Sequence, residues 1–314
     1  MLGLISIGVK RGDVVRSLVR SVCYGNGGNR NNTYGPASGG PVSMAYTSFQ
    51  STRPEQANQL SPIIIMHGLM GSKINWKSMG KAINLKTGRQ VYTVDARNHG
   101  DSPHTDHHSY PLLAEDLLFF LHEHNLPQAV LMGHSMGGRA VMAAALIEPS
   151  VVEKLVVLDI SPVGTSTSIS TLPRFLEIMR KVTLPPTVNI QEARTHIDNL
   201  LQPVIQDAGV RQFLISNLIF AENEYRWRLN LEGIARNFNP HISTFPAALT
   251  SKVFEGETAF IGGALSDYLR PEDEESIEAI FPQASFHYLE GAAHWLHADK
   301  PREFLELVTP LLNP

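Results

Sequence analysis

The sequence predicts an α/β fold in which helices flank a mostly parallel β-sheet and a helical segment is inserted. Short apolar runs such as Ile63–Met66 and Leu155–Leu158 are typical of strands buried on both faces of a parallel sheet. Helical patterns separate these runs along the chain, which favours right-handed crossover connections. This alternation breaks between about residues 163 and 250, where helical patterns occur without a convincing buried strand.

The expected elements follow from apolar periodicity and from Gly, Pro and Asn at their ends. The expected strands are Val42–Phe49, Ile63–Met66, Gln90–Val94, Ala129–Met132, Leu155–Leu158, Thr258–Ile261 and Ser285–Leu289. The expected helices of the sheet part are Trp76–Leu85, Pro111–His124, Met136–Ile147, Glu272–Ile280 and Pro301–Leu312. The inserted segment has helical patterns at Phe175–Val182, Ile190–Leu201 and Val210–Ile219.

Composition places the chain among globular proteins with a sizeable core. Of its 314 residues, 43% are hydrophobic and 18% are charged. The net charge is −4, with no basic stripe in the body of the chain, which argues against nucleic acid as the main partner. A single cysteine, Cys23, excludes an intrachain disulfide. No apolar run approaches the ~18 residues of a membrane-spanning helix, so none is expected.

Residues 1–40 differ in charge from the rest of the chain. They hold five basic residues (Lys10, Arg11, Arg16, Arg20 and Arg30) against one acid, Asp13. An arginine-rich, acid-poor segment with apolar residues at helical spacing is typical of mitochondrial targeting sequences. We therefore expect residues 1–40 to be a targeting segment and a disordered linker rich in Gly and Asn. Residues 41–314 then form the folded domain of a mitochondrial protein, matrix being the expected compartment, with a helical lid inserted at about 163–250.

The pattern Gly133-His134-Ser135-Met136-Gly137 lies between an expected strand and an expected helix. A Gly-x-Ser-x-Gly turn in this context holds the serine hydroxyl at the top of a sheet in a strained backbone conformation. The positive end of the following helix dipole points at the serine oxygen. We therefore expect Ser135 to be a nucleophile.

A second loop of small residues, His67–Ser72, follows the strand Ile63–Met66. In a serine hydrolase such a loop supplies one of the two backbone N–H groups that stabilise the oxyanion of the transition state. We expect these donors to be the N–H groups of Leu69 and Met136.

A nucleophilic serine requires a base and an acid that orients it. His294 follows the last expected strand and is the candidate base, while His297 is expected to pack or donate a hydrogen bond beside the site. Three carboxylates remain candidates for the acid: Asp267 after the penultimate strand, Asp159 after the strand Leu155–Leu158, and Glu232 inside the lid. The order serine, acid, histidine along the chain is that of the α/β-hydrolases.

Two other polar stretches are interpreted as scaffold. In residues 95–103 we expect Arg97 to pair with Asp95 or Asp101. The cluster His104, Asp106, His107 and His108 is expected to be a solvated loop and not a metal site, because adjacent histidines seldom converge on one ion. No metal or cofactor is expected.

Taken together, five pieces of the chain resemble the α/β-hydrolase domain-containing protein 11 group, and bacterial esterases of the same type are similar. The pieces are residues 67–72, 95–103, 133–138, 158–162 and 294–301. The resemblance implies an α/β-hydrolase fold with an eight-stranded sheet and a mitochondrial serine hydrolase acting on esters, acylglycerols among them. In bacterial members the acid resembles Asp159, because the loop matching Asp267 lacks a carboxylate. This chain has both, so the expected acid is Asp159, followed by Asp267 and then Glu232.

Alternative functions use the same residues differently. An acyl thioesterase would have the same triad, because the leaving group is selected by pocket shape. A hydrolase-fold scaffold that binds a mitochondrial partner protein is the non-enzymatic alternative. Several apolar side chains of the lid are expected either to line an acyl pocket or, for most of them, to form the lid's own core: Phe213, Leu214, Ile219, Phe220, Trp227, Leu229 and Phe238.

Overall fold

A computed structural model describes residues 39–53, 55, 60–164 and 166–313. The expected targeting segment and linker lie outside the described residues, apart from Gly39 and Gly40. The described part contains a seven-stranded sheet, so the expectation of eight strands is wrong for it. No helix of this part is long and apolar enough to cross a membrane.

The sheet is parallel except at one edge. Its strands are β1 (Tyr46–Phe49), β3 (Val91–Val94), β2 (Ile63–Met66), β4 (Ala129–His134), β5 (Val152–Leu158), β8 (Thr258–Gly263) and β9 (Ala284–Leu289), in that spatial order. Only β1 runs antiparallel to its neighbour. Every residue of β2, β3 and β4 is buried, as expected for strands covered by helices on both faces.

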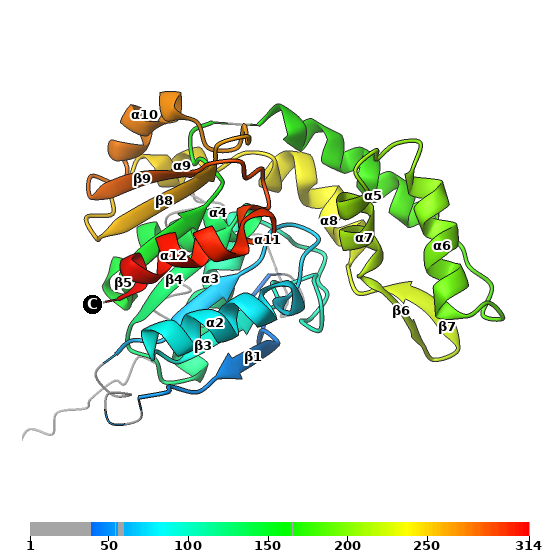
Figure 1. The fold of residues 1–314 in the computed structure, drawn as a ribbon, viewed down its shortest axis with the longest axis horizontal. Helices are drawn as coiled ribbons and strands as arrows, with labels where there is room; N and C mark the ends of the chain where they lie inside the picture. Colours follow the sequence, from blue (N-terminus) through cyan, green and yellow to red (C-terminus); the bar gives the residue numbers. More distant parts are fainter. Residues whose placement is uncertain (1–38, 54, 56–59, 165, 314) are drawn as a thin grey trace, which may run out of the picture.

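Helices cover both faces of the sheet (Figure 1). Helices α2 (Lys77–Thr87) and α12 (Pro301–Leu312) pack on one face together with α11 (Leu296–Asp299), and α3 (Tyr110–Glu123) and α4 (Met136–Ile147) pack on the other. The side chains of β2 alternate between these two cores. Ile63 and Ile65 contact the core that contains Phe304, whereas Ile64 and Met66 contact the core that contains Leu117.

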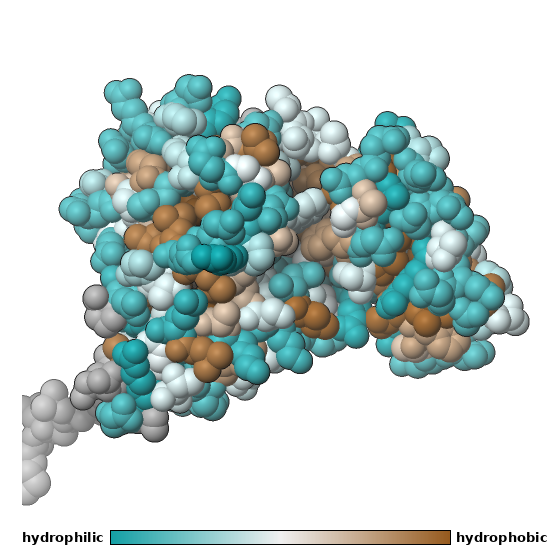
Figure 2. Space-filling model, viewed as in Figure 1, coloured by the Kyte–Doolittle hydropathy of each residue, from teal (hydrophilic) through white to brown (hydrophobic). Residues whose placement is uncertain are grey.

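Most of the segment between β5 and β8, here called the insertion, stands beside the sheet (Figure 1), whereas its last helix returns to pack against α4. Its helices are α5 (Leu172–Lys181), α6 (Ile190–Leu201), α7 (Ala208–Ile215), α8 (Leu231–Asn237) and α9 (Ala247–Thr250). Figure 2 shows the surface hollowed between the insertion and the sheet, with apolar side chains inside the hollow.

The described part of the insertion contains no strand buried along its whole length, as expected, but it does contain a hairpin of β6 (Leu218–Ala221) and β7 (Glu224–Trp227) that the sequence analysis did not predict. Both turn residues, Glu222 and Asn223, have positive φ angles of 55° and 64°. Such turns match the twist of hairpin strands. A glutamate at the first position is an uncommon signal for this turn, and the half-exposed strands lack a continuous apolar run.

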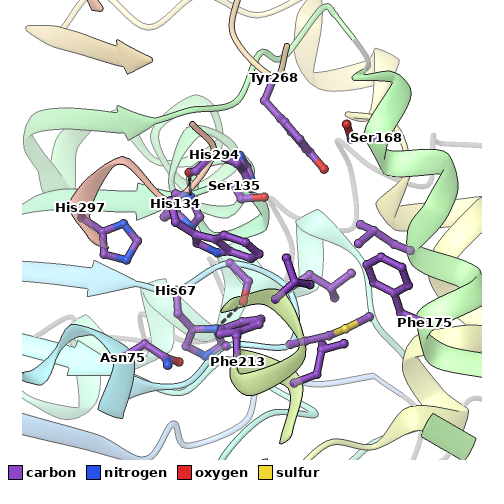
Figure 3. A pocket seen from close by; sticks show the side chains of 18 of the residues that line it. His67, Asn75, His134, Ser135, Ser168, Phe175, Phe213, Tyr268, His294 and His297 are labelled. Carbon is purple, nitrogen blue, oxygen red and sulfur yellow. Dashed lines mark hydrogen bonds between the residues drawn. The ribbon is translucent and has the colours of Figure 1, made fainter. Parts of the chain in front are cut away.

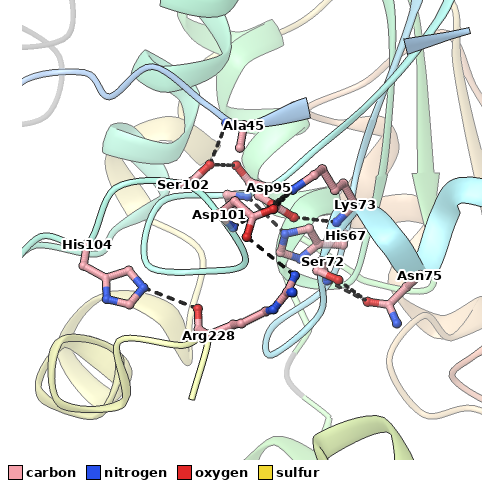
Figure 4. A network of polar contacts seen from close by, with 11 residues as sticks. Ala45, His67, Ser72, Lys73, Asn75, Asp95, Asp101, Ser102, His104 and Arg228 are labelled. Atoms are coloured by element: carbon pink, nitrogen blue, oxygen red, sulfur yellow. Dashed lines mark hydrogen bonds and ion pairs between the residues drawn. The ribbon is translucent and has the colours of Figure 1, made fainter. Parts of the chain in front are cut away.

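The loop after β3 is fixed by ion pairs other than the expected ones, and Figure 4 shows those of Asp95 and Asp101. Arg97 pairs bidentately with Asp116 at 2.6 Å for both contacts, and both side chains are fully buried. Asp95 pairs instead with Lys73, whose ammonium also contacts Asp101 at 2.6 Å. The sequence interpretation missed these partners because they lie 19 and 22 residues away along the chain.

The histidine-rich loop before α3 is only partly solvated. His108 is fully buried, which corrects the expectation of a solvated loop at this position, and its Nε2 lies 3.4 Å from Met136 Sδ. Burial lowers the pKa of His108 to about 3, so the ring is neutral at physiological pH.

Candidate active site

Ser135 occupies the tight turn between β4 and α4. Its backbone has φ 54° and ψ −118°, a conformation that residues other than glycine rarely adopt. The turn closes only because glycines stand two residues before and two residues after Ser135. A Cβ at Gly133 would lie 2.2 Å from the Gly137 carbonyl oxygen, and a Cβ at Gly137 would lie 2.4 Å from the Met66 carbonyl oxygen. The sequence therefore folds into the strained turn that exposes Ser135 at the helix N-terminus.

Of the three candidate acids, Asp159 is the one that contacts His294. The distance from His294 Nδ1 to Asp159 Oδ2 is 2.7 Å, and the Asp159 side chain is fully buried. The carboxylate also accepts hydrogen bonds from Gly263 N–H (2.9 Å) and Ser266 Oγ (2.5 Å). These contacts hold the His294 ring with Nε2 as its remaining free nitrogen.

Ser135 and His294 line the same cavity. Within the described residues, no hydrogen bond joins the Ser135 hydroxyl to His294, an arrangement common in catalytic sites before substrate binds.

Asp267 and Glu232 lie elsewhere and have other partners. The Asp267 carboxylate accepts hydrogen bonds from Ser166 Oγ (2.5 Å) and from Thr167 N–H (2.9 Å), at the beginning of the insertion. Burial alone would raise the pKa of Asp267, but these hydrogen bonds outweigh it and hold the pKa below its usual value. Glu232 forms a bidentate pair with Arg180 on the surface of the insertion.

The loop between β2 and α2 lies directly beside Ser135. A Cβ at Gly68 would lie 3.2 Å from Ser135 Cβ, so this loop can reach a bound substrate. Two contacts fix the loop: the Met70 N–H donates to His99 Nε2 (3.0 Å), and Asn217 Nδ2 of the insertion donates to the Met70 carbonyl (2.8 Å). Leu69 lines the cavity, and Met136 is the first residue of α4.

Neutral histidines surround the site. His134 Nε2 donates to the His294 carbonyl (2.8 Å), and His297 stacks on Trp76 with ring centroids 4.0 Å apart. Burial is the main cause that lowers the pKa of His134 well below its usual value and that of His297 to about 3. Rings with such lowered pKa values are poor proton acceptors, and the stacking of His297 on Trp76 agrees with the packing role expected for it. His294 is the candidate base because its ring is the one that contacts Asp159.

The cavity has a volume of about 290 Å³ and lies between the ends of the strands and the insertion. Figure 3 shows Ser135 and His294 on one side, with Ser168 of the insertion and Phe175 of α5 across the space. Its walls are mainly apolar: Leu69, Met70, Trp76, Leu172, Phe175, Val210, Phe213, Leu214, Tyr268 and Trp295. Of the apolar insertion residues considered from sequence, Phe213 and Leu214 line this space.

Sequence reasoning missed three residues that support the site. Ser266 donates to Asp159, Tyr268 stacks on the His294 ring with centroids 3.8 Å apart, and Asn217 holds the Met70 loop. Burial raises the pKa of Tyr268 to about 12. Ser266 and Tyr268 flank Asp267 in the same small-residue loop. The position of this loop after the penultimate strand was the sequence signal that could have identified both residues as part of the site. Nothing in the local sequence indicates the role of Asn217.

Comparisons with known proteins give the family. The family model described as alpha/beta hydrolase fold matches residues 61–301. The sn-1-specific diacylglycerol lipase ABHD11 of Mus musculus is 44% identical over 253 residues, covering 81% of each chain. Esterase YbfF of Escherichia coli is 32% identical over 256 residues, covering 81% of this chain and 93% of that protein.

Among solved structures, a marine microorganism esterase has a TM-score of 0.75 at 31% identity, covering 86% of this chain and 99% of that one. These two relatives and this solved structure each cover more than four fifths of the chain. The chain therefore belongs to the α/β-hydrolase family.

Proposed function

We propose that this chain is a serine hydrolase that cleaves carboxylic esters of lipids through an acyl-enzyme on Ser135. The observation that carries the proposal is the buried Asp159–His294 hydrogen bond of 2.7 Å beside a strained serine turn. A serine hydroxyl is a weak nucleophile unless a nearby imidazole takes its proton. The diacylglycerol lipase and esterase names of the relatives favour ester substrates and, among lipids, acylglycerols.

In the proposed reaction His294 Nε2 removes the proton of Ser135 Oγ, which attacks the ester carbonyl carbon. Asp159 stabilises the imidazolium that forms. The oxyanion accepts hydrogen bonds from the N–H groups of Leu69 and Met136, and each such donor is worth about 3–4 kcal/mol in the transition state. The alcohol leaves with the proton from His294. Water, deprotonated by His294, then attacks the acyl-enzyme and releases the carboxylic acid.

The cavity supports an acyl chain as the bound group. Its volume of about 290 Å³ lies just below the ~300–1,000 Å³ range of small-molecule sites. Each methylene that the apolar wall removes from water contributes about 0.8 kcal/mol. Phe175 and Phe213 lie on this wall, so we propose that the insertion acts as a lid and that one acyl chain binds beneath it.

The test is release of fatty acid from a diacylglycerol by the purified protein, with Ser135→Ala as the matched inactive variant. We expect wild type to release the acid and to react with a fluorophosphonate probe, and the variant to do neither while its melting temperature stays close to that of wild type. Full hydrolysis by Ser135→Ala would refute the proposal. An acyl thioester assayed in parallel tests the thioesterase alternative, which gains if the thioester is cleaved and the ester is not.

We further propose that the protein acts in the mitochondrial matrix, on the basis of the basic, acid-poor composition of residues 1–40. Fusing residues 1–40 to a fluorescent protein tests this proposal, because the fusion is expected to co-localise with a matrix marker. A diffuse cytosolic signal would contradict it. If wild type cleaves neither ester nor thioester, the scaffold that binds a mitochondrial partner becomes the better hypothesis.

A further inference from the structure

Arg139 is a buried cation that the proposed mechanism does not use. It lies one turn after Ser135 on α4, where its N–H donates to the Ser135 carbonyl oxygen at 3.1 Å. The residue is 1% exposed. Burying a charge is costly unless hydrogen bonds replace the lost water, so the contacts of this side chain identify what it stabilises.

The guanidinium donates to three main-chain carbonyls, two near the beginning of the insertion and one just before its last helix, α9. Nε donates to Ser161 (3.1 Å) and Nη2 to Gly164 (2.9 Å), in residues 161–164, which we name the outgoing stem. Nη1 donates to Ser243 (3.1 Å), in residues 242–243, which we name the return stem. Arg139 therefore joins the two stems to each other and to the helix of the nucleophile.

Tyr110 of α3 reinforces the return stem. Its hydroxyl donates to the Ile242 carbonyl at 2.8 Å, and its ring lies 5.8 Å from the Arg139 guanidinium carbon. The planar guanidinium presents five donors in a fixed fork, so it can reach several carbonyls in different directions at once. A lysine has one nitrogen and cannot reproduce all three contacts with the same geometry.

The outgoing stem leads directly to the wall of the cavity. It is followed by Ser168, Thr171, Leu172 and Phe175, which all line the space opposite Ser135. A shift of the stem would move this wall relative to the nucleophile, because the stem and Ser135 share Arg139 as their common anchor.

We propose that Arg139 is a positioning residue that sets the acyl-chain preference of the site by fixing both stems of the insertion to the nucleophile helix. This proposal rests on the function proposed above. It predicts that Arg139 matters for binding a long acyl chain, which needs the wall, and matters little for a short one, which needs only Ser135, His294 and the oxyanion donors.

The test compares Arg139→Met, Arg139→Lys and Arg302→Met with wild type on p-nitrophenyl acetate and p-nitrophenyl decanoate. Arg302 is the matched control because it lies on α12, away from the cavity, with its side chain 83% exposed. For Arg139→Met we expect KM for the decanoate to rise about tenfold, the effect of one or two methylenes losing the wall. The kcat of Arg139→Met for the decanoate, and its kcat/KM for the acetate, should stay within about threefold of the wild-type values.

Arg139→Lys should lie between wild type and Arg139→Met on the decanoate, and it keeps the test informative if the Met variant does not fold. Equal losses on both esters, or an unchanged KM for the decanoate, would overturn the proposal.

A second measurement does not depend on turnover. Amide hydrogen exchange should become about tenfold faster in the outgoing stem (residues 161–164) and the return stem (residues 242–243) of the Arg139 variants, with β4 and β5 unchanged. If wild type cleaves neither ester, the proposed function fails, while faster exchange confined to both stems still supports the anchoring by Arg139. Unchanged exchange in the stems overturns the anchoring.

Discussion

Replacing Asp159 by asparagine tests which carboxylate orients His294. The two oxygens of Asp159 accept from three donors: His294 Nδ1, Gly263 N–H and Ser266 Oγ. An asparagine amide has one acceptor oxygen, so at least one donor loses its partner. If the amide NH₂ faces the imidazole, the proton moves to Nε2 and the base is lost. A triad with this change loses about 10⁴ in kcat, which is about 5 kcal/mol of transition-state stabilisation.

The same change at Asp267 is the matched control. Its partners are Ser166 and Thr167 of the insertion, so Asp267→Asn should leave kcat for a short ester within about threefold and cost about 1 kcal/mol of stability. The assay is p-nitrophenyl butyrate hydrolysis, normalised by fluorophosphonate titration of the active serine and accompanied by thermal unfolding. The reasoning is refuted if Asp267→Asn loses as much kcat as Asp159→Asn, or if Asp159→Asn keeps more than about a tenth of it.

Three further predictions address the support of the site. Gly137→Ala should lose several kcal/mol of unfolding free energy or fail to fold, because its Cβ would lie 2.4 Å from a main-chain oxygen; normal urea unfolding would contradict this. Asn217→Ala should lower kcat about tenfold at unchanged fluorophosphonate titre, because the loop of Leu69 loses its bond to the insertion; an unchanged kcat would exclude it. Burial lowers the pKa of His297 to about 3 in the folded protein, below its unfolded value, so the neutral ring stabilises the fold above about pH 6.5. Between about pH 6.5 and 3 the free energy of unfolding should therefore fall by about 1 kcal/mol per pH unit because of this residue. Urea titrations of His297→Gln should show a smaller pH dependence, and an unaltered slope would count against the prediction.

The elements that the sequence predicts best are those with a strong local pattern. Helices α4, α6 and α12 have the predicted bounds, because apolar periodicity, a capping residue or a first-turn proline defines each of them locally. The turn at Ser135 is also a local feature, since two glycines and a serine at fixed spacing suffice to identify it. The expectation of an ester hydrolase agrees with the lipase and esterase names of the relatives.

The identity of the acid could not be predicted from the sequence, because it depends on the distances between residues that follow different strands. Asp159 and Asp267 both follow strands at the same edge of the sheet, and the 2.7 Å contact of His294 selects Asp159 only once the chain is folded. Arg97 has nearby acids in sequence, yet its partner is Asp116 on α3. The β6–β7 hairpin was missed because its strands are short and half-exposed. The contacts of Asp159 and Arg97 are tertiary features that no periodicity in the chain encodes locally, whereas the hairpin is local but lacks a continuous apolar run.

The direct pairing of β5 with β8 has an evolutionary consequence. The sheet is continuous without any residue of the insertion. The insertion therefore leaves the sheet at the end of β5 and returns to it at the neighbouring strand β8. Lengthening such an insertion is cheap, since doubling a loop costs only about 0.6 kcal/mol of closure entropy. The helices of the insertion can therefore be replaced during evolution while the register between β5 and β8 stays intact. Such a replacement would change the substrate-binding wall and leave Ser135 on the unchanged sheet.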